Sequence, residues 1–310
     1  MTTLLYSHAA FGAHEVPPGH AEHPGRYEAV SAALSGEEFS DLDRRAAPRA
    51  AAGDIERVHA AAYRAAVESA SPDKGLVQLD ADTFMGRSSL DASLRAAGAA
   101  IAAVDALYAG EATNAFVAAR PPGHHAEPDK AMGFCLFNAA AIAAHHARAV
   151  HGARRIAVVD FDVHHGNGTE AAFWSDEDAF FASSHEWPQY PGTGKETDRG
   201  DFANIHNAPL ATGTGGQEFR RAWGERLLPA LSDFGPDIVV ISAGFDAHAA
   251  DPLGGLALSE DDYVWITGEI LGVARDKAGA RVVSLLEGGY DLPALGASAA
   301  AHVRTLNAVA

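Results

Sequence analysis

The chain has 310 residues, of which 47% are hydrophobic and 21% charged, so it can bury a large core and is not a largely disordered protein. Its 41 acidic residues outnumber 23 basic ones, and the net charge of −18 argues against binding to a nucleic acid backbone. The single cysteine, Cys135, excludes an intramolecular disulfide framework, and no apolar run reaches the ~18–20 residues that span a bilayer. Because the N-terminal MTTLLYSHAAFG also lacks the features of a signal peptide, we expect a cytoplasmic protein with neither nucleic acid nor membrane as a partner.

Short apolar runs alternate with Ala-rich stretches along the chain. The runs are rich in β-branched or aromatic residues and predict strands at residues 3–7, 114–119, 155–160, 178–183, 237–242 and 281–286. Between them, helical spacing of apolar residues is clearest over residues 92–109 and 139–150. This alternation is typical of α/β proteins with a parallel sheet, so we expect one α/β domain over residues 1–310 rather than two domains.

Five of the predicted strands are followed by loops rich in His, Asp, Tyr and Gly. In chain order the loops contain PPGHH, DFDVHHGNG, SSHEWPQYPGTG, AGFDAHAADPLGG and EGGYD. The carboxyl ends of parallel strands lie along one edge of the sheet, where α/β proteins build their sites. The five loops therefore predict one functional site at that edge.

Asp162 and His164 are the first candidate metal ligands. They lie two residues apart where a predicted strand ends, so an extended backbone would direct both side chains to one face, with Asp160 on the same side. One carboxylate and one imidazole make half of a tetrahedral zinc site, and Asp246 is the best candidate for a third ligand. An isolated Asp-x-His pair more often caps a loop, but the four other loops favour a catalytic metal site with an open position for water.

The adjacent His124 and His125 follow a rigid Pro-Pro-Gly loop and can accept and donate protons if other groups orient them. Asp160 and Asn167 are the expected partners. Tyr290 follows two glycines and can donate a hydrogen bond to a developing oxyanion. We expect the histidines away from this edge to be surface or packing residues, namely His8, His14, His59, His145, His146, His151, His206 and His302.

In this order, the motifs PPGHH, GFCLFN, DFDVHHGNGT, PGTG, AGFDAH with DPLGG, and EGGY resemble the zinc-dependent histone deacetylase superfamily. The resemblance is closest to its class II branch and to bacterial histone deacetylase-like amidohydrolases, and it covers about His20 to Asp291. It implies the arginase/deacetylase fold, an α/β domain with a central eight-stranded parallel sheet and helices on both faces. It makes Asp162, His164 and Asp246 the zinc ligands, His124 and His125 the tandem histidines, and Tyr290 the phenol that stabilises the oxyanion.

The resemblance also implies substrate and potassium sites. Gly133 and Phe134 match one wall of a tunnel for an acyl-lysine stem, Tyr190 matches a second tunnel aromatic, and we expect Leu253 and Gly288 to line the same region. Asn167 stands where class II enzymes carry Asn, and Arg26 resembles an N-terminal arginine near the base of the site. A structural potassium ion would be held by the Asp160 carboxylate, the Ser183 hydroxyl and mainly backbone carbonyls of Asp162, His164 and Ser184. A second monovalent ion would be held by the backbone of Phe173, Asp176 and Ala179.

The expected activity is metal-assisted hydrolysis of an amide, with His125 as general base and then acid and with His124 as electrostatic support.

The first alternative is an acetylpolyamine amidohydrolase, but the gatekeeper Glu of such relatives is replaced by Leu253, which favours acyl-lysine substrates. An inactive acyl-lysine-binding module would lack a ligand, a histidine or the tyrosine, and all are present. A binuclear arginase-like hydrolase would need a bridging carboxylate and a second histidine ligand pattern that are not evident. The expected partners are acyl-lysine peptides or proteins, or acetylated small amines, with acyl chain length and a homo-oligomer left open.

Overall fold

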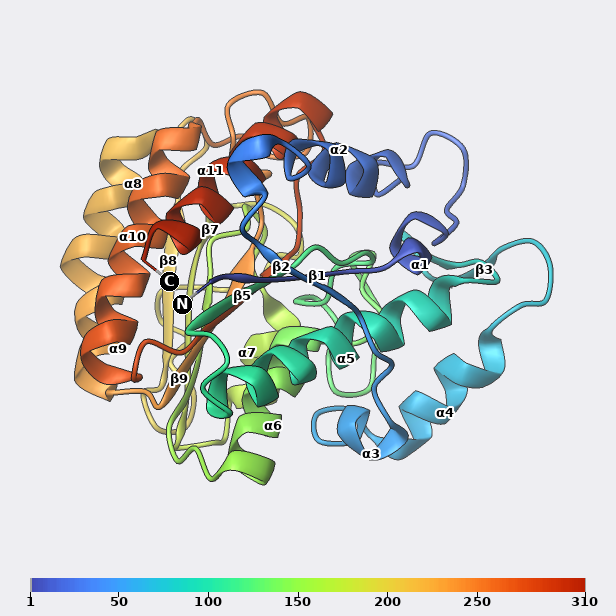
Figure 1. Cartoon of the computed structure of the whole chain (residues 1–310), viewed down its shortest axis with the longest axis horizontal. Helices are drawn as coiled ribbons and strands as arrows, with labels where there is room; N and C mark the ends of the chain where they lie inside the picture. Colours follow the sequence, from blue (N-terminus) through green and yellow to red (C-terminus); the bar gives the residue numbers. More distant parts are fainter. Residues whose placement is uncertain (1, 310) are drawn as a thin grey trace.

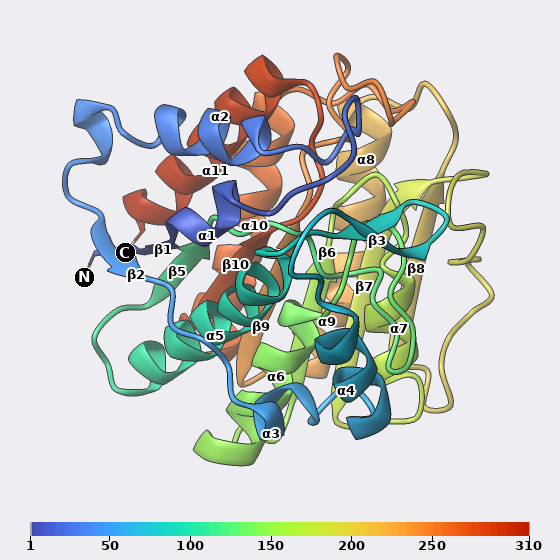
Figure 2. The same ribbon diagram turned by 90° about the vertical axis from the view of Figure 1, so that its right-hand side faces the viewer.

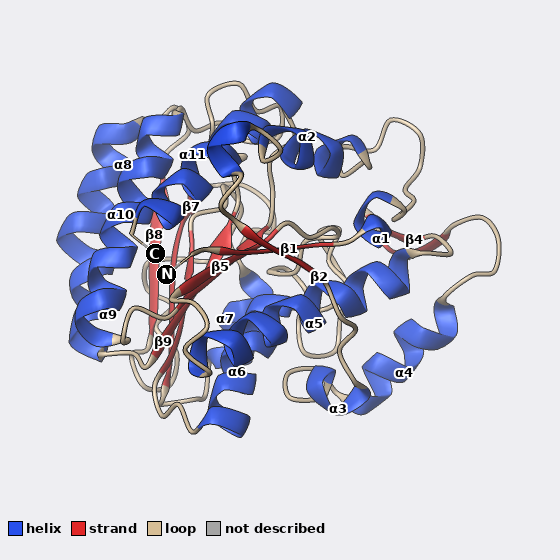
Figure 3. Cartoon of the chain, viewed as in Figure 1, coloured by secondary structure: helices blue, strands red, loops and turns tan. Residues whose placement is uncertain are grey.

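A parallel sheet of eight strands runs through the middle of the computed structural model, which describes residues 2–309 (Figures 1 and 3). Every neighbouring pair of strands in this sheet is parallel. The order across the sheet is β2 (Asp43–Ala46), β1 (Leu4–Ser7), β5 (Asn114–Val117), β10 (Val282–Leu286), β9 (Ile238–Ala243), β6 (Ile156–Asp160), β7 (Ala179–Glu186) and β8 (Ile205–Leu210). The predicted eight-stranded α/β fold is confirmed.

All six predicted strands are present, and the two that were not predicted form the edges of the sheet. β2 has the sequence DRRA and alternates between half-buried and exposed residues, while β8 has the sequence IHNAPL. An edge strand pairs on one side only, so it needs no continuous apolar run, and charged residues there protect it from pairing with other chains. The apolar pattern therefore identified only the central strands.

Two layers of helices cover the sheet (Figures 1 and 2). One apolar cluster lies under α2 (Gly25–Ala33), α8 (Gly216–Ala222), α9 (Leu228–Phe234), α10 (Glu260–Lys277) and α11 (Leu292–Ala308), with a π-helical turn at Trp223–Leu227 and a 3-10 turn at Glu37–Phe39. The other cluster lies under α5 (Ser89–Tyr108) and α6 (Ala139–His151), and it includes residues of α1 (Ala9–Gly12), α3 (Ala52–Ile55), α4 (Ala61–Ala70) and α7 (Asn167–Phe173). A short antiparallel hairpin, β3 (Val77–Asp80) and β4 (Thr83–Met85), stands apart from the main sheet. Among residues 2–309, no helix is both long and apolar enough to cross a membrane.

The helix α6 illustrates how local sequence sets an element's limits. Asn138 caps its first turn, because the side-chain oxygen accepts a hydrogen bond of 2.9 Å from the Ala141 amide. Gly152 ends it with a φ of 71°, a left-handed conformation in which glycine has no steric penalty. Between these caps, the Ala-rich sequence lets α6 pack closely against α5.

The strands β5, β6, β7, β9 and β10 all end at the same edge of the sheet, as expected. Two details differ from the prediction. β6 ends at Asp160, so Asp162 and His164 lie in a bend rather than on an extended strand. β7 continues to Glu186, beyond the predicted end at residue 183, so Ser184 also lies within the strand, because β8 pairs with it from Phe181 to Glu186.

Candidate active site

Asp162, His164 and Asp246 come together beyond the ends of β6 and β9. Nδ1 of His164 lies 3.2 Å from Oδ1 of Asp162 and 3.2 Å from Oδ2 of Asp246. The bend after β6, and not the alternation of an extended strand, brings Asp162 and His164 together. The three residues predicted as metal ligands are therefore neighbours in space.

Backbone amides orient the two carboxylates. Oδ2 of Asp162 accepts a hydrogen bond of 2.8 Å from the Gly288 amide, and Oδ1 of Asp246 accepts one of 2.8 Å from the Val163 amide. The other oxygen of Asp246, Oδ2, is buried and accepts no hydrogen bond. A buried carboxylate oxygen without a hydrogen-bond partner, beside an imidazole nitrogen, fits a metal ligand, because a bound cation would satisfy it.

The spacing of these ligand atoms suits a small tetrahedral cation. With zinc–oxygen and zinc–nitrogen bonds of about 2.0–2.1 Å, tetrahedral ligand atoms lie about 3.3–3.4 Å apart. The two separations of 3.2 Å around His164 are close to that value. Burial, together with the charge of Asp162, raises the pKa of Asp246 to about 7, and a cation bound beside this carboxylate would oppose that shift.

Gly288 lies behind the two carboxylates rather than in the wall of the pocket. A Cβ atom on Gly288 would lie 1.9 Å from Oδ2 of Asp246 and 2.5 Å from Oδ2 of Asp162. Any side chain here would displace the carboxylates that its amide helps to hold. The predicted substrate-binding role of Gly288 therefore becomes one of backbone support for Asp162.

His124 is buried between two acidic residues. Its Nδ1 lies 2.9 Å from Oδ2 of Asp160, and its Nε2 lies 3.8 Å from Oδ1 of Asp162. Burial opposes a charge on this imidazole, but the negative charges of Asp162 and Asp160 outweigh it and raise the pKa of His124 well above its ordinary value. These carboxylates therefore favour the charged form of His124.

His125 has the opposite electrostatic environment. Burial, together with the neighbouring charge of His124, lowers the pKa of His125 well below its ordinary value. Its Nδ1 lies 2.8 Å from Oδ1 of Asn167, whose Nδ2 donates to the Glu127 carboxylate at 2.7 Å. Because Asn167 must present its oxygen to the imidazole, Nδ1 of His125 carries the proton and Nε2 keeps a free lone pair. His125 can accept a proton at Nε2.

These histidines open into a pocket of about 210 Å³ at the same edge of the sheet. The tandem histidines and His164 form part of its lining, together with Tyr290 and every predicted tunnel residue except Gly288. The full lining is Asp82, Pro122, His124, His125, Gly133, Phe134, His164, Gln189, Tyr190, Leu253 and Tyr290.

Aromatic rings surround the pocket. Tyr190 lies edge-on to His125 with ring centroids 5.2 Å apart, and Phe134 lies edge-on to Tyr290 at 5.9 Å. The guanidinium of the buried Arg26 stacks 4.8 Å from the centre of the Tyr290 ring and donates to the Gly289 carbonyl at 2.6 Å. Arg26 therefore lies at the base of the site, as expected, and Tyr290 is held between a cation and a phenyl ring.

The environment of Ser183 is compatible with the predicted potassium site. Nε2 of His185 lies 2.8 Å from the Gly194 carbonyl, which can only accept, so Nε2 carries the proton. Nδ1 of His185 then accepts from the Ser183 hydroxyl at 2.9 Å, and the lone pairs of that oxygen remain available to a cation. The carbonyls predicted for the second monovalent site, those of Phe173, Asp176 and Ala179, instead accept hydrogen bonds from the side chain of Asn204.

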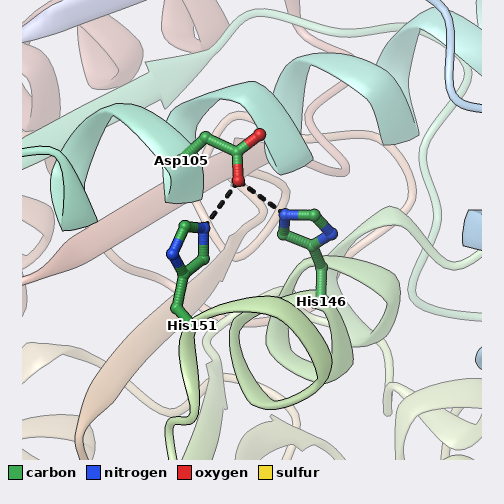
Figure 4. A group of neighbouring side chains, drawn as sticks. All are labelled: Asp105, His146 and His151. Atoms are coloured by element: carbon green, nitrogen blue, oxygen red, sulfur yellow. Dashed lines mark hydrogen bonds and ion pairs between the residues drawn. The ribbon is translucent and has the colours of Figure 1, made fainter.

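A second group of potential metal ligands lies between α5 and α6 (Figure 4). Oδ1 of Asp105 is 2.6 Å from Nε2 of His146 and 2.7 Å from Nε2 of His151. These are hydrogen-bond distances, shorter than the roughly 3.3 Å between tetrahedral zinc ligands. Nδ1 of His146 is buried without a partner, whereas metal-binding histidines usually donate from their second nitrogen. This group joins two helices, which extends the expected packing role of His146 and His151.

Sequence reasoning missed three acidic residues around the site. Glu127 orients Asn167, as described above. Glu287 is buried and accepts from the Gly123 amide at 2.6 Å and the His124 amide at 3.2 Å, which fixes the loop that carries the tandem histidines. Asp82 lines the pocket from the turn between β3 and β4. Glu287 begins the EGGYD motif and Glu127 lies two residues after PPGHH, whereas nothing near Asp82 in the sequence marks it.

Comparisons with known proteins identify the family of the chain. Residues 20–306 match the family described as "Histone deacetylase domain". The chain is 39% identical to histone deacetylase 14, chloroplastic, of Arabidopsis thaliana, over 98% of this chain and 76% of that protein. It is 41% identical to the histone deacetylase-like amidohydrolase of Pseudomonas aeruginosa, over 88% of this chain and 73% of that protein. The solved structure titled "Crystal Structure of HDA15 HD domain" superposes with a TM-score of 0.93 at 32% identity, covering 99% of this chain and 88% of that one.

Proposed function

The chain belongs to the histone deacetylase family, and we propose that it is a zinc-dependent amidohydrolase that removes acetyl or other acyl groups from lysine side chains. Family membership supports deacetylase or amidohydrolase activity in general. One observation carries the finer proposal: a buried set of ligands that fits a small cation reaches the pocket through His164, and the pocket is also lined by His125, whose surroundings favour its neutral form. The proposal treats the whole chain as one catalytic domain.

Asp162, His164 and Asp246 would hold the zinc, which would lower the pKa of a water molecule towards ~7 and polarise the acyl carbonyl. Nε2 of His125 accepts the proton of the attacking water, because Asn167 keeps the proton of His125 on Nδ1. The same nitrogen then delivers that proton to the leaving amine. The charged His124 offsets the negative charge that develops beside it.

Tyr290 and the pocket walls complete the proposed mechanism. The Tyr290 hydroxyl donates a hydrogen bond to the oxygen of the tetrahedral adduct, and the packing of its ring against Arg26 and Phe134 orients it beforehand. Burial raises the pKa of this phenol well above its ordinary value, so it keeps the proton that it must donate. The aromatic rings of Phe134 and Tyr190 exclude water around the lysine stem.

The rim of the pocket bears on the choice of substrate. Leu253 lies in the pocket lining and offers no charge to a distal ammonium, which favours acyl-lysine over acetylpolyamines. One observation is compatible with the polyamine alternative: Asp82 also lines the pocket, and its Oδ1 accepts a hydrogen bond of 3.1 Å from the Gly133 amide. A fixed carboxylate can accept from a peptide amide or pair with an ammonium, so this residue suits either substrate class.

A structural potassium ion completes the proposal. Asp160, Asp162, His164, Ser183 and Ser184 would hold it, and the free lone pairs of the Ser183 hydroxyl support this assignment.

The test combines a metal count with a substrate panel on the same preparations. We expect about one zinc per chain, and hydrolysis of acetyl-lysine peptides with higher kcat/KM than of acetylpolyamines; longer acyl-lysines in the same panel measure the preferred acyl chain length. Asp246→Ala should lose both metal and activity, because two ligands cannot hold the ion. Asp105→Ala removes the carboxylate of the hydrogen-bonded group in Figure 4 and should keep both. Unchanged zinc in Asp246→Ala would contradict the ligand assignment.

A further inference from the structure

Three backbone carbonyls converge on one side-chain nitrogen at the start of β7. Nδ2 of Asn204 lies 2.8 Å from the Phe173 carbonyl, 3.2 Å from the Asp176 carbonyl and 2.9 Å from the Ala179 carbonyl. Asn204 is 5% exposed and directly precedes β8. The contacts tie the end of α7, the following turn and the first residue of β7 to the neighbouring strand.

A ring of carbonyl oxygens is a site for a monovalent cation when no donor fills it. Here these are the three carbonyls expected to hold a second ion, and an amide group occupies the point on which they converge. We infer that the carboxamide of Asn204 replaces the cation, so that this chain has no ion between Phe173, Asp176 and Ala179.

The orientation of the amide follows from its surroundings. With Nδ2 towards the carbonyls, its two N–H groups serve three acceptors, and Oδ1 is left buried without a partner. The reverse orientation would place a fourth oxygen against three carbonyls, and only a bound cation could hold those four oxygens together. Without an ion, one unpaired acceptor costs less than that arrangement, so the nitrogen faces the carbonyls.

The neighbouring backbone makes room for the unpaired oxygen. A Cβ atom on Gly200 would lie 2.5 Å from Oδ1 of Asn204, and Gly200 has a φ of +67°, which glycine adopts without strain. The space on this side of the amide therefore exists only because residue 200 is glycine. Asn204 and Gly200 act together as a built-in substitute for an ion.

Crystals of the full-length zinc-loaded protein, grown with rubidium in place of potassium, test the inference directly. We expect no anomalous peak between the three carbonyls of the native protein, and a peak there in Asn204→Ala, whose cavity is open to an ion. A peak between these carbonyls in the native protein would overturn the inference. The native crystal decides this point even if the variant does not fold.

Thermal unfolding gives an independent measurement in solution. The comparison is the Tm in potassium against the Tm in tetramethylammonium at equal ionic strength. This difference should be larger in Asn204→Ala than in the native protein by roughly 2–4 °C, since an ion would now stabilise the folded state. Any ion at the Ser183 site contributes equally to both proteins.

A second buried asparagine supplies the matched control. Asn114 is 1% exposed, its Nδ2 donates to the single carbonyl of Leu306 at 3.0 Å, and its Oδ1 has no partner. Asn114→Ala should lower the Tm without any new dependence on potassium. If Asn204→Ala and Asn114→Ala depend on potassium to the same extent, Asn204 is not an ion substitute.

Discussion

His124 and His125 are adjacent in the chain, yet their protonation states differ because their partners differ. His124 faces the carboxylates of Asp160 and Asp162, while His125 faces a neutral amide and two imidazoles. The pKa of the first is raised and that of the second is lowered, so the carboxylates favour the charged form of His124 and the surroundings of His125 favour a neutral base. The same rigid loop thus places two imidazoles with different roles, electrostatic support and proton transfer, in one pocket.

The Tyr290 hydroxyl should matter to turnover and not to metal binding. Tyr290→Phe keeps the ring that packs on Arg26 and Phe134 and removes only the donor to the oxyanion. Loss of one such donor typically lowers kcat by ~10²–10³. Single-substrate kinetics with an acetyl-lysine peptide, beside elemental analysis for zinc, should show this loss at unchanged metal content. A kcat near that of the native protein would move the oxyanion role to another group.

The residue at position 253 should govern the choice between peptide and polyamine. Leu253→Glu would bring a second carboxylate to the pocket lining, next to the one already supplied by Asp82. A carboxylate ~4 Å from an ammonium contributes about 1–4 kcal/mol, and ~1.4 kcal/mol changes a rate ratio tenfold. The ratio of kcat/KM for N8-acetylspermidine over an acetyl-lysine peptide should therefore rise roughly tenfold or more.

The native protein is the control for this prediction. If it already hydrolyses acetylpolyamines better than acetyl-lysine peptides, Asp82 outweighs Leu253, and the polyamine alternative is the better assignment.

At the scale of elements, two helical glycines are predicted to respond oppositely to the same substitution. In α5, a Cβ atom on Gly98 would lie 2.3 Å from the Pro48 carbonyl, so Gly98→Ala must push a backbone segment away. In α10, nothing lies within 4 Å of a Cβ atom on Gly268. Alanine is favoured over glycine inside a helix by about 0.5–1 kcal/mol. Gly268→Ala should stabilise by about that amount, whereas Gly98→Ala should destabilise by about 1–3 kcal/mol.

Urea unfolding of the two variants against the native protein measures both changes. Equal stabilisation in both would show that α5 can shift away from residue 48, and that the close packing of this helix layer is not required.

At the scale of the whole molecule, buried neutral histidines connect distant segments. The Thr267 hydroxyl donates its proton to the Tyr263 carbonyl, so it must accept from Nδ1 of His302, which lies 2.6 Å away. Nε2 of His302 then accepts a hydrogen bond of 2.8 Å from the Ser284 hydroxyl. His59 likewise donates to the Glu127 carbonyl at 3.0 Å. Burial lowers the pKa of His302 to about 3 and that of His59 to about 4.

These pKa values predict acid lability. The folded-state values lie below the unfolded value of about 6.5, so the unfolded chain takes up protons first as the pH falls. The free energy of unfolding should therefore fall below pH 6.5 and continue to fall to about pH 4, by up to ~1.4 kcal/mol per pH unit for each such histidine. Urea titrations at pH 6.5, 5.5 and 4.5 measure this slope. In His302→Gln, this slope should be smaller by the contribution of one histidine, up to ~1.4 kcal/mol per pH unit. An unchanged slope would exclude His302 as a contributor.

The fold and much of the site could be predicted from local sequence. Continuous apolar runs identified the six strands that the sheet buries on both faces, and the polar motifs after five of them predicted the edge at which the site forms. The choice of Asp246 as the partner of Asp162 and His164 also agrees with their placement. These features could be predicted because each depends on a residue and its near neighbours in the chain.

Tertiary structure decided the features that depend on contacts between distant segments. The edge strands β2 and β8 lack a buried pattern of their own and form because a neighbouring strand pairs with them. Asp82 reaches the pocket from a hairpin outside the main sheet, and Asn204 reaches the carbonyls of a turn more than twenty residues earlier. Sequence alone determined which chemical groups the chain offers at one edge of a parallel sheet. Only packing decided which atoms of those groups are already paired and which are left free to bind a metal, a proton or a substrate.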